Sequence, residues 1–310
     1  MSKKISLAPL VLFAYNRPEN TQKTLEALER NDSATDSNLF IFADGVKDPS
    51  NAEEKSLVDE VNRVVNGRWK FKSVEVLSRD YNYGLASNII SGVSEVIERF
   101  ERVIVLEDDL VTSKHFINFM NKCLMKYEMD AKIMSIGGWA PLLPKYSRYK
   151  KDVYLTTRGC SWGWGTWYKS WIKADWELSD FESFSLDNKA QEKLNRGGTD
   201  LTRLLRAAYY GDIDSWAIKW DYSHYKNNSY CLRPCYSLIE NIGFGANATH
   251  TKADKPRMSS HFTNDWLPAL PGSVKPNKIL MQRFATAMDG RYREEAGPIK
   301  RSLGRIIKYL

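Results

Sequence analysis

The segment Val103-Ile-Val-Leu-Glu-Asp-Asp-Leu110 carries four apolar residues directly into three consecutive acids. A short, continuous apolar run is typical of a strand that is buried on both faces. Three carboxylates at the tip of such a strand repel one another unless a cation offsets their charge, and Mg²⁺ and Mn²⁺ prefer oxygen ligands of this kind. The segment therefore predicts a buried strand that ends at a divalent metal site facing a phosphate group.

The chain before this segment alternates strand-like with helix-like patterns. Apolar runs at 9–14, 39–43 and 74–77 predict strands, and apolar residues at helical spacing in 18–28, 51–65 and 87–100 predict helices. Such alternation is typical of a parallel sheet with helices on its faces. We therefore predict an α/β, Rossmann-like fold with a mostly parallel central sheet flanked by helices.

Polar residues follow the ends of three of these predicted strands. Asn16-Arg17 follows the first strand, Asp44-Gly45 the second and Glu107-Asp108-Asp109 the fourth. Open α/β sheets bind nucleotides outside the carboxyl ends of their strands. We expect the three groups to converge there on one nucleotide site.

The charged residues of this expected site each allow two interpretations. Three acids in a row are common on solvated surfaces, but the apolar strand before them favours a sheet edge. Asp109 is then the first choice for the metal ligand, while Glu107 and Asp108 accept hydrogen bonds from ribose or sugar hydroxyls. Asp44 either meets the uracil or ribose of a nucleotide or is an ordinary turn aspartate. Arg17 either pairs with a diphosphate through its planar guanidinium or forms a structural ion pair.

The segment Gly211-Asp-Ile-Asp-Ser-Trp-Ala-Ile-Lys-Trp220 places two acids before a predicted helix whose inward residues include Trp216 and Trp220. Asp214 is either the N-cap of that helix or a general base. The two roles are compatible, because a cap needs only one carboxylate oxygen. Asp212 is the reserve candidate for the base.

Two further groups have a structural and a functional interpretation. His250 follows a loop of small residues at 242–249, where an imidazole either completes a metal site, touches a diphosphate or is simply exposed. Trp162, Trp164 and Trp167 alternate with glycine, which suits stacking on sugar rings and equally suits a packed core.

Composition predicts a globular protein of a reducing cytoplasm. The 310 residues are 43% hydrophobic, which supports a sizeable core. No apolar stretch approaches the roughly 18 residues of a membrane span, and we interpret the apolar run before Ala14 as a first strand rather than a cleaved signal. The four cysteines form no CxxC pair and no dense framework.

The chain carries a net charge of +7, which favours anionic partners. In the last segment, 298–310, isoleucine and leucine recur at helical intervals against lysine and arginine. This basic amphipathic tail either lies on an anionic membrane or packs on the domain with a solvated basic face.

Three motifs together resemble one enzyme family. Val105-Leu-Glu-Asp-Asp-Leu110 is similar to its metal and donor motif, Asp214-Ser-Trp216 resembles its catalytic Asp-Asp-Trp, and Cys231-Leu-Arg-Pro-Cys235 followed by Gly243-Phe-Gly245 is similar to its Arg-Pro strand and glycine turn. From about residue 8 to about 250 the chain resembles the GT-A glycosyltransferases. The resemblance is to the family of the N-acetylglucosaminyltransferase that initiates complex N-glycans and to its bacterial relatives in surface polysaccharide synthesis.

The resemblance implies a role for each of the matching residues. It implies that Asp109 ligates Mn²⁺ or Mg²⁺, that Glu107 and Asp108 contact the donor, and that Asp214 is the base of an inverting transfer. It also implies that His250 lies on the metal. Ser215 departs from the family motif and so does the 79–85 loop, which looks more like bacterial family 2 transferases; the donor therefore does not follow by analogy.

The expected activity is metal-dependent, inverting transfer of a sugar from a nucleotide-diphospho-sugar, a UDP-sugar by preference. The expected acceptor is a hydroxyl of a growing capsule or O-antigen glycan linked to polyprenyl diphosphate. We expect the protein on the inner face of the membrane or free in the cytoplasm, with no nucleic-acid partner. Alternatives are a retaining transferase and a non-catalytic nucleotide- or carbohydrate-binding module; a nucleotidyltransferase would need a glycine-rich loop that 15–18 lacks.

The expected organisation is one glycosyltransferase domain over 1–251. Its nucleotide-binding half covers about 1–130, and a less regular acceptor and catalytic half covers 131–251. A C-terminal extension, 252–310, carries the basic tail.

Overall fold

The structure is a computed structural model that describes residues 7–143, 146–244 and 260–295, with the backbone alone for 290–295. Two predictions, the metal ligand His250 and the amphipathic tail at 298–310, lie outside these residues.

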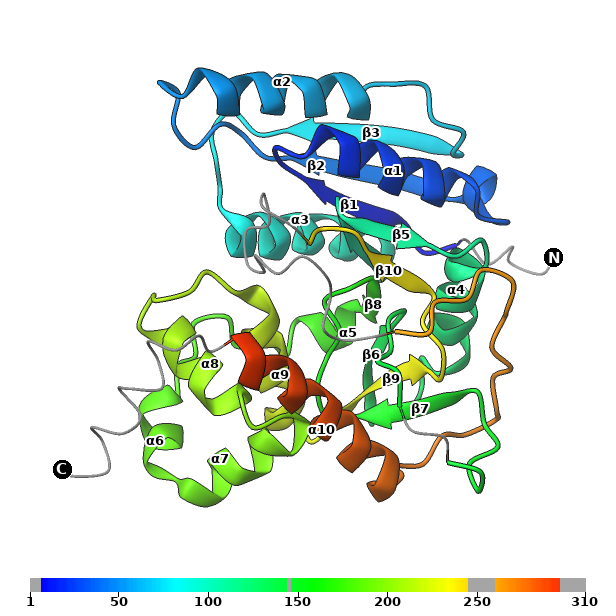
Figure 1. Ribbon diagram of the computed structural model, residues 1–310, viewed down its shortest axis with the longest axis vertical. Coiled ribbons are helices and arrows are strands. Elements are labelled where there is room, and N and C mark those ends of the chain that lie inside the picture. The colour runs from blue at the N-terminus through cyan, green and yellow to red at the C-terminus, as the bar shows by residue number, and fades with distance from the viewer. Residues whose placement is uncertain (1–6, 144–145, 245–259, 296–310) are drawn as a thin grey trace.

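Within the described residues, an eight-stranded sheet runs through the centre of the molecule in the order β3-β2-β1-β4-β8-β6-β9-β7 (Figure 1). The strands are β1 (Leu10–Ala14), β2 (Asn38–Ala43), β3 (Ser73–Ser78), β4 (Arg102–Glu107), β6 (Ile133–Gly137), β7 (Val153–Thr156), β8 (Trp164–Trp167) and β9 (Tyr230–Pro234). The pairs β2–β3, β1–β2, β1–β4 and β6–β9 are parallel, whereas β8 runs antiparallel to β4 and β6, and β7 to β9. The predicted α/β fold with a mostly parallel central sheet is confirmed.

The first half of the chain builds the parallel side of this sheet from βα units. Its helices are α1 (Pro18–Glu29), α2 (Ala52–Val65) and α3 (Leu85–Phe100), close to the predicted ranges. Pro18 opens α1, and the Asn51 side chain caps α2 by accepting from the Glu54 amide. Across the sheet, the chain moves from β1 to β2 and on to β3 in one direction. It then returns past β1 to β4 in the opposite direction. Right-handed crossovers therefore place α3 on the face opposite α1 and α2.

The second half completes the sheet and adds a smaller helical layer. After α4 (Phe116–Lys126), it contains α5 (Tyr168–Trp171), α6 (Phe181–Leu186), α7 (Asn188–Leu194), α8 (Leu201–Tyr209) and α9 (Trp216–Lys226), with a short 3₁₀ turn at Asn195–Gly197; another such turn, Ala34–Asp36, precedes β2 in the first half. Helices α6 to α9 pack around their own apolar cluster, which includes Phe181, Phe184, Leu205 and Tyr222. A two-stranded ribbon of β5 (Leu110–Thr112) and β10 (Ile239–Asn241) lies beside the main sheet.

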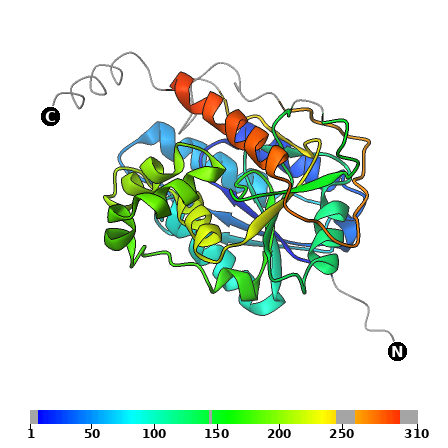
Figure 2. The ribbon, with the colours of Figure 1, turned by 90° about the horizontal axis from the view of Figure 1, so that it is seen from below.

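Helix α10 (Lys278–Glu295) lies across the second half of the molecule (Figure 2). It buries Leu280, Phe284 and Met288 in the same hydrophobic core that the sheet strands fill. Part of the expected extension at 252–310 thus packs on the domain. Among the described residues, no helix is both long and apolar enough to cross a membrane.

Candidate functional site

The carboxyl ends of β1 and β4 bring two predicted groups together. The two strands are parallel neighbours with Phe13 in register with Glu107, so the residues that follow them meet at one edge. The Tyr15 amide lies 3.3 Å from Asp108 Oδ2, and Arg17 Nη1 lies 3.1 Å from Asp109 Oδ2. Two of the three predicted strand-end groups therefore meet, and Arg17 makes its ion pair there with the predicted metal ligand.

The three acids are crowded and largely shielded from solvent. Burial raises the pKa of Glu107 well above its usual range, and the charges of Asp109 and Asp108 add to the effect. Burial, followed by the charge of Asp109, raises the pKa of Asp108 to about 7, against the opposing effect of Arg17. The cluster therefore disfavours its own ionisation, and additional positive charge would stabilise the carboxylates.

A short segment after β10 closes over Asp109. Strand β10 pairs antiparallel with β5, which directly follows the acids, and the Ile242 amide donates to the Asp109 carbonyl at 2.8 Å. The backbone of Gly243 then lies so close that a Cβ at this position would overlap the Asp109 carboxylate. Gly243 is therefore a structural part of the acidic site, because only a residue without a side chain fits there.

Asp44, after β2, organises the loop that follows β3. It is 6% exposed, and its Oδ1 accepts hydrogen bonds from the amides of Gly45 (3.0 Å) and Tyr83 (2.8 Å) while Oδ2 accepts from Asn82 Nδ2 (3.0 Å). Burial raises its pKa, and these backbone hydrogen bonds oppose the shift. Asp44 thus fixes the segment Asn82–Gly84 on the sheet edge.

The structure places Asp214 against a different helix from the one predicted. Helix α9 begins at Trp216, with Ser215 at its N-cap position and no side-chain cap hydrogen bond. Of the two interpretations of Asp214, the N-cap of α9 is therefore wrong: Asp214 Oδ2 instead accepts from the Ala86 amide at 3.2 Å, in the first turn of α3. The role of general base remains a prediction. The carboxylate reaches α3 because Gly84, at the N-cap of that helix, has no side chain in the way.

Asp214 and Asp44 therefore flank the same loop, the first near Gly84 and the second at Tyr83. Both Asp214 and the reserve candidate Asp212 are exposed. An exposed carboxylate is accessible to a hydroxyl of another molecule, which is a requirement for a general base.

The tryptophans of the 162–167 segment divide between the two predicted environments. Trp164 and Trp167 are buried core residues, 1% and 2% exposed, and Trp164 stacks on Trp216 at a centroid distance of 4.9 Å. Trp162 remains partly exposed and lies edge-on to Trp139 at 4.9 Å. The core interpretation holds for the first two, and only Trp162 of the three borders a pocket.

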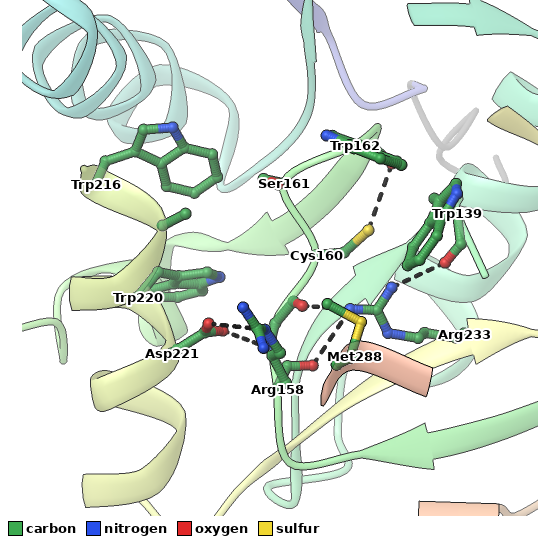
Figure 3. A pocket seen from close by; sticks show the side chains of 12 residues that line it. Trp139, Arg158, Cys160, Ser161, Trp162, Trp216, Trp220, Asp221, Arg233 and Met288 are labelled. Atoms are coloured by element: carbon green, nitrogen blue, oxygen red, sulfur yellow. Dashed lines mark hydrogen bonds and ion pairs between the residues drawn. The ribbon is translucent and has the colours of Figure 1, made fainter. Parts of the chain in front are cut away.

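That pocket contains buried charges that the sequence analysis missed. Arg158 binds Asp200 through both Nη atoms at 2.8 and 3.1 Å, and its Nε lies 3.5 Å from Asp221 (Figure 3). Burial raises the pKa of Asp221 to about 6, although Arg158 opposes the shift. Arg233, within the apolar strand Tyr230–Pro234, is 2% exposed. Arg233, a charged residue inside an apolar strand, was the sequence feature that could have indicated a buried charge cluster.

In the part of the chain that the structure describes, no three His, Cys, Asp or Glu side chains form a set that could hold a metal ion by themselves. Any metal at the acidic site would have to complete its coordination with oxygens from a substrate, from water or from residues beyond those described.

No family model and no curated protein matches this chain. Among solved structures, the mannosyltransferase PcManGT from Pyrobaculum calidifontis, in complex with GDP-Man and Mn²⁺, is 9% identical over 73% of this chain and 73% of that chain, with a TM-score of 0.35. S. aureus TarS 1–349 is 11% identical over 76% of this chain and 60% of that chain (TM-score 0.39). A UDP-glucose pyrophosphorylase complexed with UDP-glucose is 10% identical over 76% and 92% (TM-score 0.37). At these TM-scores the likenesses carry no argument about function, which has to follow from the residues of the site.

Proposed function

We propose that this protein is a metal-dependent GT-A glycosyltransferase that moves a sugar from a nucleotide-diphospho-sugar to a hydroxyl of a glycan. The observation that carries the proposal is the contact of Arg17 with Asp109 at the carboxyl ends of β1 and β4. A cation and a carboxylate at this edge of an α/β sheet suit a diphosphate and the metal that accompanies it.

The residues present fit a hard divalent cation, Mn²⁺ or Mg²⁺. Asp109 would hold it, and Glu107 and Asp108 would remain donor contacts; His250 is the further ligand proposed from the family resemblance. The raised pKa values of Glu107 and Asp108 support the fit, because a nearby cation offsets the repulsion between buried carboxylates. Mg²⁺ commonly takes only one or two protein carboxylates beside substrate phosphates, which agrees with the small protein donor set. When bound, such an ion supplies Lewis-acid stabilisation of the leaving diphosphate.

We assign the remaining chemistry to residues of this chain. Arg17 exchanges its partner Asp109 for a diphosphate oxygen when the donor arrives, as the planar guanidinium allows. Asp214 accepts the proton of the acceptor hydroxyl while the hydroxyl oxygen bonds to the anomeric carbon, and the bond from that carbon to the nucleoside diphosphate breaks on the opposite side. A single displacement of this kind inverts the anomeric configuration. Its hydrogen bond from Ala86 uses one carboxylate oxygen and fixes the orientation of the other.

The sequence resemblance supports a more specific proposal for the donor and the acceptor. We propose a UDP-sugar donor, with the loop held by Asp44 against the base or ribose, and a polyprenyl-diphosphate-linked acceptor of a capsule or O-antigen. Deletion of 298–310 would then reduce binding to vesicles that contain anionic lipid. Unchanged vesicle binding would remove the support for a membrane-borne acceptor.

The test is a thermal-shift screen of UDP- and GDP-sugars with and without Mn²⁺. A ligand that binds only the folded state raises the melting temperature according to its affinity, so we expect one donor to give a shift that requires Mn²⁺. The Asp109→Ala variant should lose that shift. If none of these nucleotide sugars raised the melting temperature in an Mn²⁺-dependent way, the proposal would be contradicted. The anomeric configuration of the product, read by NMR, separates an inverting from a retaining enzyme.

A further inference from the structure

A pocket of about 70 Å³ lies between α9 and the 158–162 loop (Figure 3). Trp216 and Trp220 of α9 lie on one side of it, and Trp139 and Trp162 lie on the other. Trp162 and Ala217 are partly exposed, so the pocket is accessible from solvent. Aromatic faces with a few polar groups between them are typical of a small-ligand site.

One polar group in the pocket wall lacks a partner. Trp220 is 1% exposed, and its Nε1 forms no hydrogen bond with any residue in the described ranges. The ring edge that carries this nitrogen faces the 158–162 loop, since a Cβ added to Gly159 would lie 3.2 Å from Trp220 Cδ1 (Figure 3). A buried donor without an acceptor costs free energy, so a ligand oxygen placed here would be stabilised.

The charged groups of the pocket are already engaged with one another or with the backbone. Arg158 binds Asp200 and Asp221, and Arg233 donates to the carbonyls of Trp139 and Gly159. The two guanidinium groups and the two carboxylates balance in charge. Asp221 also accepts from the Gly159 amide at 2.6 Å. The pocket therefore has no strong preference for an anion, and the polar group in its wall that still lacks a partner is the Trp220 indole N–H.

We propose that this pocket binds part of an uncharged sugar of the acceptor: one hydroxyl enters the pocket and accepts from Trp220 Nε1, while the rest of the sugar ring lies at the pocket opening beside the partly exposed Trp162. The proposal rests on the glycosyl-transfer function above and specifies its acceptor. The acceptor hydroxyl must reach Asp214, and Trp216 in the pocket wall follows that residue by two positions in the chain. An indole N–H without an acceptor matches a sugar hydroxyl, and the partly exposed ring of Trp162 matches the apolar face of a sugar.

The test measures binding of simple glycosides to the full chain by saturation-transfer NMR. The probes are the methyl α- and β-glycosides of glucose, galactose, mannose and N-acetylglucosamine. We expect at least one of them to bind, and Trp220→Phe to weaken it about 3- to 10-fold, the worth of one uncharged hydrogen bond. Ala217→Leu, which adds volume to the pocket wall without removing a polar group, should weaken binding about 10-fold or more.

Two controls separate this assignment from a general disturbance and from the transferase proposal. Trp171→Phe removes an indole N–H from the same tryptophan cluster, one that donates to Ser94 Oγ away from the pocket, and should bind the glycoside as the wild type does. Asp109→Ala should also keep glycoside binding while it loses the Mn²⁺-dependent donor shift. Wild-type affinity in both Trp220→Phe and Ala217→Leu, or no binding by any glycoside, would overturn the pocket assignment. The donor screen stands or fails independently of that result.

Discussion

Asp214 Oδ2 accepts a hydrogen bond from the Ala86 amide at 3.2 Å, although 128 residues separate the two in the chain. The contact joins the start of α9 to the start of α3, and therefore the second half of the chain to the first. The hydrogen bond holds the carboxylate that we propose as the base against α3.

The first prediction concerns this contact. Asp214→Asn should lower the rate of sugar transfer by about 10²- to 10⁴-fold, the usual contribution of general base catalysis. The donor-dependent thermal shift should persist, because the amide oxygen of asparagine still accepts from Ala86. Asp212→Asn is the matched control at an exposed neighbour and should retain activity. The reverse pattern in a steady-state assay would move the base to Asp212.

The second prediction tests the close approach of Gly243 to the acidic site. Gly243→Ala should displace the Asp109 carboxylate, because the added Cβ overlaps it. We expect Mn²⁺ affinity to fall about 10- to 100-fold, as for other residues that orient metal ligands. Gly272→Ala is the control, since a Cβ there meets no atom within 4 Å. Equal Mn²⁺ titrations for the two variants would show that Gly243 does not position Asp109.

The third prediction concerns the loop anchored by Asp44. Asp44→Ala leaves the amides of Gly45 and Tyr83 without their acceptor, and it should lower the free energy of unfolding by about 2 to 4 kcal/mol. Urea denaturation measures this loss. Asp48→Ala removes an exposed carboxylate that accepts from Ser50 and should lower the free energy of unfolding much less than Asp44→Ala does. Similar losses in both variants would mean that Asp44 is no more than an ordinary turn residue.

The fourth prediction is a pH dependence of stability. Burial lowers the pKa of His224 from 6.5 to about 4, while the neutral ring contacts Ser135 Oγ and the Trp220 carbonyl. Between these values the unfolded chain binds a proton that the folded chain excludes, so stability falls as the pH falls from about 6.5 toward 4.

The measurement compares the free energy of unfolding at two pH values. Between about pH 7 and pH 5 the wild type should lose about 2 kcal/mol more than His224→Gln does. His261→Gln is the control and should follow the wild type. Parallel curves for wild type and His224→Gln would contradict the assignment of this proton to His224.

The first half of the fold was predictable because each unit is local. Strands β1, β2 and β4 contain uninterrupted apolar runs, whereas β3 alternates valine with polar residues at the sheet edge. The helices α1 and α2 between them start at recognisable positions, Pro18 and Asn51. The side chains that follow parallel strands meet at one edge, so the neighbourhood of Arg17 and Asp109 followed from the pattern alone.

The second half depends on pairings between distant residues. Strand β8 inserts between β4 and β6, with Val105 in register with Trp164. Every residue of β8 is buried, so it shows no alternation that would distinguish core from ligand contact. The position of Asp214 also required the tertiary structure, because its nearest donor belongs to α3.

The pocket cluster was hidden for a different reason. Arg158, Asp200 and Asp221 neutralise one another only after the chain has folded, and charged residues of this kind are ordinarily expected on the surface. Arg233 alone departed from its surroundings in the sequence, as the charged residue of an apolar strand.

The position of β8 has a consequence for synthesis of the chain. Strand β4 is apolar, and one of its edges stays unpaired until the ribosome has made Trp164–Trp167. At typical translation rates that interval lasts roughly several seconds, during which a nascent chain exposes an aggregation-prone edge. Slower elongation prolongs this exposure, so the yield of soluble protein should depend on how quickly the ribosome crosses the 108–167 segment.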